Sequence, residues 1–301
     1  MPLNVVEWHW EITSRCNLNC LHCITNCGQP RTNELSKESA IRAVKVMKKM
    51  GCKHLMITGG EPLCSPFLLD ILRECKWRNI GVSFLTNGFA VCRDFVRQCQ
   101  GLVDSVGVSL DGSSVSVNDR IRGRDSFKRA CRAVSTFSGM FPTSVYVVAS
   151  GNNIGDLEEI CRLAFSLGAV SVHISEITMS GRAAEHVNSL ALSERGHRRL
   201  IDFAKRKTGV QNPAMGCSAD FSSLYVSSEG VVYPCSEIAI TAPQNSTISI
   251  VGKGVLQSLR RSKTFFAGIE KQCCYEVYTG NRFTFVLNSG AACPMLERRL
   301  R

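Results

Sequence analysis

The stretch Arg15-Cys16-Asn17-Leu18-Asn19-Cys20-Leu21-His22-Cys23 places three cysteines in a CxxxCxxC spacing, directly after a β-prone segment at residues 5–12. Three thiolates this close in sequence can hold one iron–sulfur cluster and leave its fourth iron without a protein ligand. Zinc takes four protein ligands in structural sites, so the spacing argues against zinc. Cys27 could be a fourth ligand, although the loop already supplies three.

Outward from this loop, β-prone runs alternate with helix-period segments. Strands are expected at residues 5–12, 54–58, 81–86, 105–110, 144–149 and 171–177. Helices are expected at residues 36–50, 66–76, 92–98, 126–138 and 156–167. Because strictly alternating units imply parallel strands with right-handed crossovers, we predict an α/β fold, an open (β/α)6 partial barrel. Chemistry is expected at the C-terminal ends of its strands.

After a further expected helix at residues 193–207, the alternation stops. Residues 224–226 and 231–233 flank Ser227-Ser228-Glu229-Gly230, which predicts a β-hairpin. The cysteines of this region are Cys217, Cys235, Cys273, Cys274 and Cys293. The sequence therefore predicts two domains, a partial barrel over residues 1–208 and a small metal-stabilised module over residues 209–301.

Composition is ordinary for a soluble globular protein, with 44% hydrophobic and 20% charged residues, and a cytoplasmic location is expected. No stretch approaches the ~18 apolar residues of a membrane span, and the N-terminus lacks the features of a signal peptide. In such a chain, 16 cysteines indicate metal ligation rather than disulfides. The net charge of +11 is scattered, and only Arg298, Arg299 and Arg301 form a run. Neither a membrane nor a nucleic acid is expected as a partner.

The CxxxCxxC loop after the first strand, followed by Gly59-Gly60-Glu61-Pro62 after the second, resembles the radical S-adenosylmethionine (SAM) superfamily. The resemblance implies that Cys16, Cys20 and Cys23 hold a 4Fe-4S cluster and that the amine and carboxylate of SAM bind its open iron. With an electron from an external donor such as flavodoxin or ferredoxin, SAM would be cleaved to a 5′-deoxyadenosyl radical. This radical would take a hydrogen atom from the substrate.

The same resemblance implies which other residues bind SAM: Gly59, Gly60, Glu61, Ser109, Asp111, Arg122 and His22. Glu61 and the two glycines would take the ammonium group of SAM. Ser109 and Asp111, on one face of the fourth strand, would accept hydrogen bonds from the ribose. Arg122 would bind the carboxylate, and His22 would pack beside the adenine. Each residue alone also has an ordinary interpretation as a turn residue or a surface charge.

The C-terminal region resembles the SPASM and shortened twitch domains that carry auxiliary clusters in this superfamily. Cys217, Gly230 and the run Val231-Val232-Tyr233-Pro234-Cys235 follow the opening pattern of these domains. With Cys273, Cys274 and Cys293, the ligands are enough for one further cluster, which makes two 4Fe-4S clusters in all. Adjacent Cys273 and Cys274 are not both expected to bind the same iron site, and the sequence leaves open which of them does.

The expected start of the first strand near residue 5 leaves no room for a fused peptide-recognition domain, so a small-molecule substrate is expected. The layout resembles aminoglycoside epimerases of the neomycin C epimerase type. Carboxylates that could line a pocket for such a cationic sugar are Glu7, Glu11, Glu176, Asp220 and Glu237. The alternatives are a radical SAM enzyme that forms thioethers, cyclophanes or D-residues in a peptide, an aminocyclitol dehydrogenase, and a nucleic-acid-binding iron–sulfur protein.

Epimerisation requires a hydrogen donor on the face opposite to hydrogen abstraction, and a thiol is the usual donor. The resemblance to the epimerases implies such a thiol on the expected strand Thr247-Ile248-Ser249-Ile250-Val251. Ser249 occupies the candidate position, which we interpret as an engineered Cys→Ser form. If Ser249 is instead an ordinary strand serine, the thiol would come from Cys27, Cys64, Cys273 or Cys274.

Overall fold

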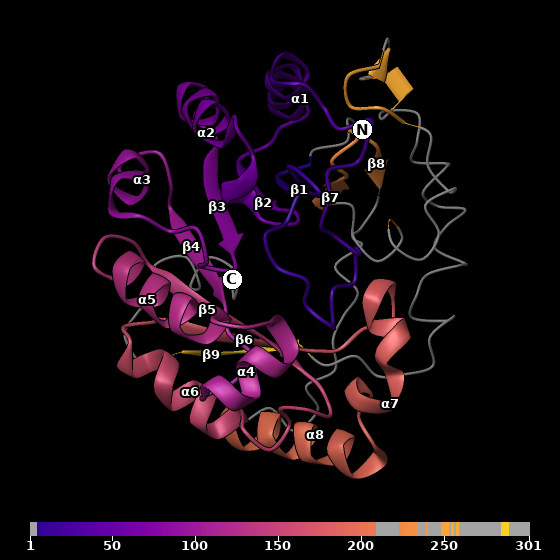
Figure 1. Cartoon of the computed structure of the whole chain (residues 1–301). Helices are drawn as coiled ribbons and strands as arrows, with labels where there is room; N and C mark the ends of the chain where they lie inside the picture. The colour runs from indigo at the N-terminus through magenta and orange to yellow at the C-terminus, as the bar shows by residue number, and fades with distance from the viewer. Residues whose placement is uncertain are drawn as a thin grey trace.

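The computed structural model describes residues 5–208, 223–233, 239, 248–252, 254–255, 257–258 and 284–288. The barrel strands are β1 (Glu7–Glu11), β2 (His54–Thr58), β3 (Gly81–Thr86), β4 (Ser105–Ser109), β5 (Thr143–Ala149) and β6 (Ser171–Glu176). They lie side by side in sequence order, and each neighbouring pair is parallel (Figure 1). The predicted open, parallel α/β partial barrel is therefore confirmed.

The helices that alternate with these strands lie where the sequence predicts them, within two residues at each end. They are α1 (Lys37–Lys49), α2 (Leu68–Trp77), α3 (Arg93–Gln98), α5 (Ser126–Ser138), α6 (Leu157–Ser166) and α8 (Glu194–Thr208). The Ser36 hydroxyl accepts a hydrogen bond from the Ser39 amide and so caps α1. These helices form an arc along the outer side of the sheet (Figure 1).

The main hydrophobic core fills the space between the sheet and these helices. Along β1, Trp8 and Trp10 are fully buried in this core, whereas Glu7 and His9, which alternate with them, are partly exposed. This alternation follows from the two-residue period of a strand. It leaves polar side chains for the inner face and for the C-terminal edge of the barrel.

Four short helical segments were not predicted: η1 (Pro62–Cys64), α4 (Val115–Arg122), η2 (Gly181–His186) and α7 (Val187–Leu190). The sequence of α4 is polar and short, so its periodicity is weak. Tertiary contacts stabilise it, because the buried Asn118 side chain accepts from the Asp111 amide at 2.8 Å and donates to the Ser126 hydroxyl at 2.8 Å.

The segments after α8 extend the same sheet at both edges. β7 (Ser223–Val226) pairs in parallel with β1, and β8 (Val232–Tyr233) returns antiparallel to β7, which confirms the predicted hairpin. β9 (Thr284–Asn288) pairs antiparallel with β6. Instead of the strand expected at residues 247–251, the structure has an isolated antiparallel bridge between Val231 and Ser249. The division into two domains stays a prediction.

Several residues proposed from the sequence lie outside the described residues: Cys217, Cys235, Cys273, Cys274, Cys293, Asp220 and Glu237. In the part of the chain that the structure describes, no helix is both long and apolar enough to cross a membrane.

Candidate active site

The three cysteines of the CxxxCxxC motif lie in a loop that follows the C-terminal end of β1, and residues 15–34 are called the cysteine loop below. Its backbone folds back on itself: the Cys16 amide donates to the Gly28 carbonyl at 2.8 Å, and the Gly28 amide donates to the Ser14 carbonyl at 3.0 Å. The loop is thereby held at the edge of the barrel where the chemistry of parallel α/β barrels is found.

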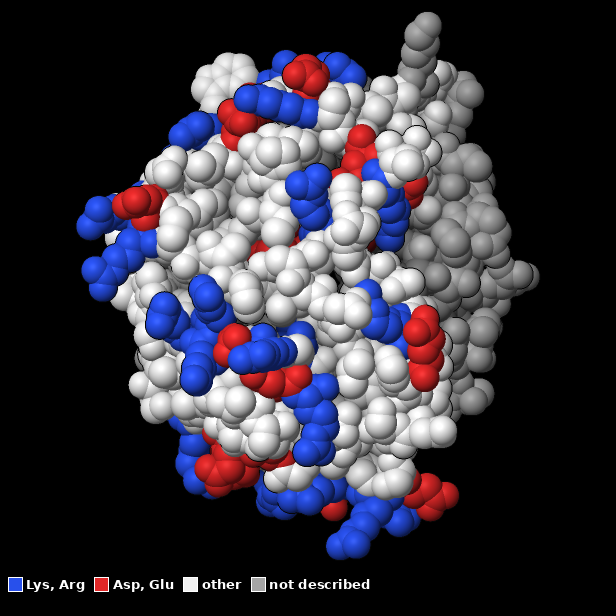
Figure 2. Space-filling model, in the orientation of Figure 1, with Lys and Arg blue, Asp and Glu red and all other residues white. Residues whose placement is uncertain are grey.

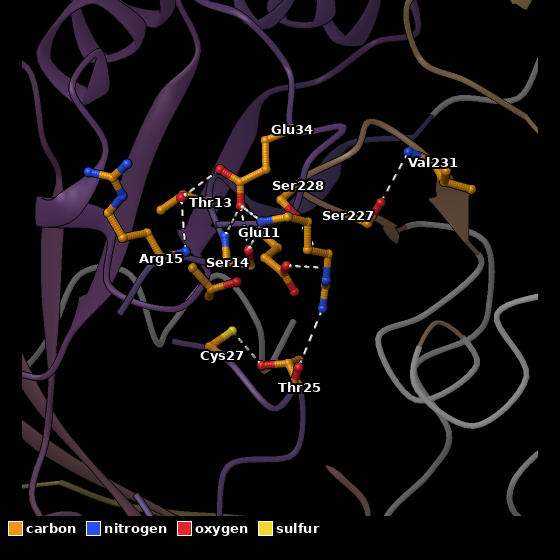
Figure 3. Close-up of polar contacts among 12 residues, drawn as sticks. Glu11, Thr13, Ser14, Arg15, Thr25, Cys27, Glu34, Ser227, Ser228 and Val231 are labelled. Atoms are coloured by element: carbon orange, nitrogen blue, oxygen red, sulfur yellow. Dashed lines mark hydrogen bonds and ion pairs between the residues drawn. The ribbon is translucent and has the colours of Figure 1, made fainter. Parts of the chain in front are cut away.

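Glu34 closes the base of the cysteine loop (Figure 3). Its Oε1 accepts hydrogen bonds from the Ser14 amide at 2.5 Å and the Ser14 hydroxyl at 2.5 Å, and its Oε2 accepts from the Thr13 hydroxyl at 2.9 Å. Partial burial acts to raise the pKa of Glu34, but the Ser14 and Thr13 donors outweigh it and hold that pKa below its usual value. Sequence reasoning missed Glu34, because its partners lie about 20 residues earlier in the chain.

Polar groups from distant segments surround the sulfur atoms. The Asn87 Nδ2 lies 3.9 Å from Cys16 Sγ, the Cys27 amide donates to Cys23 Sγ at 3.3 Å, and Cys20 Sγ lies 3.6 Å from the Arg122 carbonyl. Donors directed at sulfur are typical of thiolates that hold an iron–sulfur cluster. Among the described residues, no three His, Cys, Asp or Glu side chains converge as ligands of a single metal ion would.

Arg182, at the start of η2, binds the cysteine loop from the β6 side. Its guanidinium donates to the Cys20 carbonyl at 3.0 Å and to the Cys27 carbonyl at 2.7 Å, and its amide donates to the Cys23 carbonyl at 2.9 Å. The neighbouring Gly181 has φ of 55°, and a side chain there would overlap the Ile24 carbonyl. No local sequence signal marks Arg182, because its role depends on a contact with a remote loop.

Gly59 and Gly60 let the end of β2 lie directly against the start of the cysteine loop. Gly59 has φ of 148°, and a side chain on Gly60 would overlap the backbone of Arg15. The Gly60 amide donates to the Thr13 carbonyl at 2.7 Å, and the Glu61 amide donates to the Arg15 carbonyl at 2.9 Å. Gly59 and Gly60 are therefore needed for the close packing of β2 against the cysteine loop. This role does not depend on whether they also bind a ligand.

Glu61 is fully buried, and its carboxylate holds the loop after β3. Oε1 accepts from the Thr86 hydroxyl at 2.7 Å and the Leu63 amide at 3.1 Å, and Oε2 accepts from the Asn87 amide at 2.7 Å. Burial raises the pKa of Glu61, although these donors favour its charged form. Glu61 thus positions Asn87 beside Cys16, and its expected contact with the SAM ammonium stays a prediction.

Asp111, just beyond β4, is fully buried and has both oxygens occupied. Oδ2 accepts from Arg122 Nε at 2.5 Å and lies 2.9 Å from His22 Nε2, while Oδ1 accepts from the Val148 amide at 2.7 Å. Burial opposes ionisation, but Arg122 and His22 outweigh it and hold the pKa of Asp111 well below its usual range. Asp111 therefore orients Arg122 and His22. The expected contacts of Asp111 and the buried Ser109 with a ribose stay predictions.

His22 supplies the test of whether a further ligand fits at this site. It is buried, and its Nδ1 has no hydrogen-bond partner among the described residues. Such a buried unpaired nitrogen is uncommon and calls for a partner beyond the described residues, such as a bound ligand. Because His22 and the buried Arg122 lie beside Cys20, the residues present fit a polar cofactor that carries a carboxylate, such as SAM, next to a cluster.

A second ion pair, between the buried Glu11 and the partly exposed Arg31, links the cysteine loop to the β7–β8 hairpin (Figure 3). Glu11 Oε1 accepts from Arg31 Nη1 at 2.8 Å, and Glu11 Oε2 accepts from the Tyr225 hydroxyl at 2.8 Å. Arg31 also donates to the Ser228 hydroxyl at 3.2 Å and to the Thr25 carbonyl at 3.4 Å. Burial raises the pKa of Glu11, and Arg31 opposes this shift. The loop and the hairpin are therefore held together through the end of β1.

The carboxylates proposed to bind a cationic sugar already have partners in the chain. Glu11 is taken by Arg31 and Tyr225, and Glu176 lies 3.0 Å from His197 Nδ1. Glu7 lies 3.5 Å from His9 Nε2. Their role in substrate binding stays a prediction, and these contacts do not favour it.

Tyr225→Phe should lower the free energy of unfolding by about 1–3 kcal/mol, because Oε2 of the buried Glu11 loses its donor. Urea denaturation measures the change. A double-mutant cycle with Glu11→Gln is the control, since the effect of Tyr225→Phe should shrink when the carboxylate is already absent. If Tyr225→Phe is as stable as the wild type, the hydrogen bond from Tyr225 to Glu11 does not help to hold the hairpin.

Residues 10–164, more than half of the chain, match the family model of the Radical SAM superfamily. The chain therefore belongs to the radical SAM superfamily, as the sequence motifs predict. Membership implies a 4Fe-4S cluster and SAM at the site formed by the cysteine loop.

Among curated proteins, the chain is similar to mycofactocin maturase MftC of Mycolicibacterium smegmatis, with 31% identity over 202 residues, 66% of this chain and 51% of the maturase. It is also similar to the AdoMet-dependent heme synthase of Methanosarcina barkeri, with 24% identity over 77% of each chain. The chain thus spans about half the length of the maturase that it matches. These relatives do not support the predicted aminoglycoside epimerase.

Among solved structures, the fold is similar to that of Streptococcus suis SuiB bound to precursor peptide SuiA, with a TM-score of 0.67. The match covers 85% of this chain and 64% of SuiB at 14% identity, so it shows a shared fold.

Proposed function

We propose that this chain is a radical SAM enzyme that modifies a peptide, by forming a thioether, a cyclophane or a D-residue. The observation that supports this proposal is the 31% identity with mycofactocin maturase across two-thirds of the chain. SuiB, which has the same fold, is seen with its precursor peptide, so the fold can accommodate a peptide. The internally paired Glu7, Glu11 and Glu176 give a polycationic sugar fewer free carboxylates to bind.

In this proposal, residues of the cysteine loop and of the segments packed around it have different roles at the site. Cys16, Cys20 and Cys23 would hold the 4Fe-4S cluster, while Arg122 would bind the SAM carboxylate and His22 would contact the adenine. When bound, the cluster and SAM supply a 5′-deoxyadenosyl radical that removes a hydrogen atom from the substrate. Glu61 and Asp111 would act as positioning residues, because each orients groups that lie beside the cysteines.

A second 4Fe-4S cluster is proposed for the C-terminal region, with ligands from Cys217, Cys235, Cys273 or Cys274, and Cys293. The confirmed β7–β8 hairpin supports this proposal, since Cys235 follows β8 by two residues. Ser249, bridged to Val231 beside the hairpin, was assigned as a hydrogen donor only through the epimerase hypothesis. Without that hypothesis, we do not propose Ser249 as a catalytic residue.

The experiment uses reconstituted, reduced protein with SAM under anaerobic conditions. Three kinds of substrate are compared: synthetic peptides encoded by short reading frames beside the gene, neomycin C, and a porphyrin precursor of haem. We expect 5′-deoxyadenosine to form with one peptide, together with a mass change or deuterium incorporation in that peptide. Conversion of neomycin C or the porphyrin, without any peptide product, would contradict the proposal. A Cys16→Ala variant controls for cleavage that does not depend on the cluster.

A further inference from the structure

A positively charged surface lies over α4 and α5 (Figure 2). Its exposed basic residues are Arg120, Arg124, Lys128, Arg129 and Arg132. The acidic residues among them are Asp119 and Asp125. Asp119 is occupied by the amides of Asp125 and Phe127 at 2.7 and 2.8 Å, and Asp125 forms only an exposed pair with Arg124 at 3.7 Å. The surface formed by these five basic residues, called the α4–α5 surface below, is therefore positive on balance.

The helices of the α4–α5 surface contact two segments of the cysteine site: the cysteine loop itself and the loop after β3. At the C-terminal end of α4, the Ile121 carbonyl accepts from the Leu21 amide at 2.9 Å, and the Arg122 carbonyl lies 3.6 Å from Cys20 Sγ. At the first turn of α5, the Arg129 guanidinium lies over the Phe89 ring, 4.7 Å from its centroid.

Phe89 follows Asn87 by two residues, and Asn87 Nδ2 lies 3.9 Å from Cys16 Sγ. The basic residues therefore surround the outer wall of the site that holds two of the three thiols. A redox protein seated on them would lie on the side of the site where α4 and the loop after β3 contact Cys20 and Cys16.

We propose that the α4–α5 surface is the docking site of a small acidic electron-transfer protein, such as a flavodoxin. Complementary charge steers such partners and orients them, and this effect weakens as salt is added. One electron would pass from the reduced flavin of the partner to the cluster that Cys16, Cys20 and Cys23 would hold, so that the flavin is oxidised and the cluster reduced by one electron each, with no covalent bond made or broken. The inference is independent of the proposed peptide substrate, because the reduction precedes any substrate chemistry.

A matched control surface lies at the other end of the barrel. Lys49, Lys53 and Lys76 are exposed, and they lie close before the N-terminal ends of β2 and β3. Because the strands are parallel and the cysteine loop follows the C-terminal end of β1, these lysines lie at the opposite edge of the sheet. Reversing the charge of these three lysines changes the net charge of the protein as much as reversing the charge of three basic residues of the α4–α5 surface.

The experiment titrates holoenzyme with a fluorescently labelled recombinant flavodoxin and measures Kd at low and high ionic strength. Charge reversal by Arg124→Glu, Lys128→Glu and Arg132→Glu should raise Kd at least about tenfold at low salt and flatten the salt dependence. The control variant, with Lys49→Glu, Lys53→Glu and Lys76→Glu, should change Kd less than about threefold. Equal weakening by both variants would overturn the proposal, since it would show that only the net charge matters.

A second measurement separates docking from damage to the site. The rate of 5′-deoxyadenosine formation without added substrate is measured once with reduced flavodoxin and once with dithionite. The α4–α5 variant should lose rate with flavodoxin and keep the wild-type rate with dithionite, which needs no protein docking surface. Equal losses with both reductants would show that the substitutions disturb the cluster site, and would overturn the proposal.

Discussion

Replacing Cys16, Cys20 and Cys23 together with alanine should abolish 5′-deoxyadenosine formation and remove about four irons from each reconstituted chain. The three sulfur atoms share one loop at the end of β1, and the structure surrounds them with the Asn87 side chain and the Cys27 amide. Without these three thiolates, the loop lacks the ligands that would hold the cluster. Iron analysis, absorption spectra and product chromatography measure the loss.

The matched control replaces three cysteines outside the loop, Cys92, Cys131 and Cys161, which lie on or beside helices α3, α5 and α6. This variant should keep both its iron and its activity. Formation of 5′-deoxyadenosine by the loop variant would contradict the ligand assignment. About eight irons in the wild type and four in the loop variant would support the second cluster, and about four in the wild type would contradict it.

The sequence predicted the barrel well because its signals are local. Each strand of the barrel is a short β-rich run, most of them bounded by turn residues, and most of the helices carry an apolar stripe that packs on the sheet. The exception, α4, has no such stripe and depends on the buried Asn118, whose partners Asp111 and Ser126 lie on either side of the helix. Propensity cannot anticipate a helix that is stabilised in this way.

The candidate site was predicted only in part, because a sequence shows residue types but not which of them already have partners. Glu11 and Asp111 were both expected to face a ligand, and in the structure each is a buried carboxylate paired with an arginine. Arg182, which binds the backbone of the cysteine loop, gives no signal in the sequence at all. Such contacts join segments that are far apart in the chain, and only the fold brings them together.

Asp111→Asn should lower the free energy of unfolding of the apoprotein by about 3–5 kcal/mol at neutral pH. The substitution keeps the shape of the side chain but removes the charge that offsets the buried Arg122 guanidinium, 2.5 Å away. Removing both charges, by combining Asp111→Asn with Arg122→Met, should recover much of this loss, because no unpaired charge then stays buried. Urea denaturation of the four proteins completes a double-mutant cycle.

The pH dependence of the free energy of unfolding is a second test of the Asp111–Arg122 ion pair. Because the folded-state pKa of Asp111 lies below its unfolded value of about 3.9, its ionised form stabilises the fold fully above that pH. The contribution is lost as the pH falls toward the lower, folded-state pKa. The stability difference between wild type and Asp111→Asn should therefore be constant from about pH 7 to pH 5 and should shrink below about pH 4. A difference that persists unchanged in acid would mean that shape, and not charge, is what Asp111 contributes, and the assignment of Asp111 as the residue that orients Arg122 would then fail.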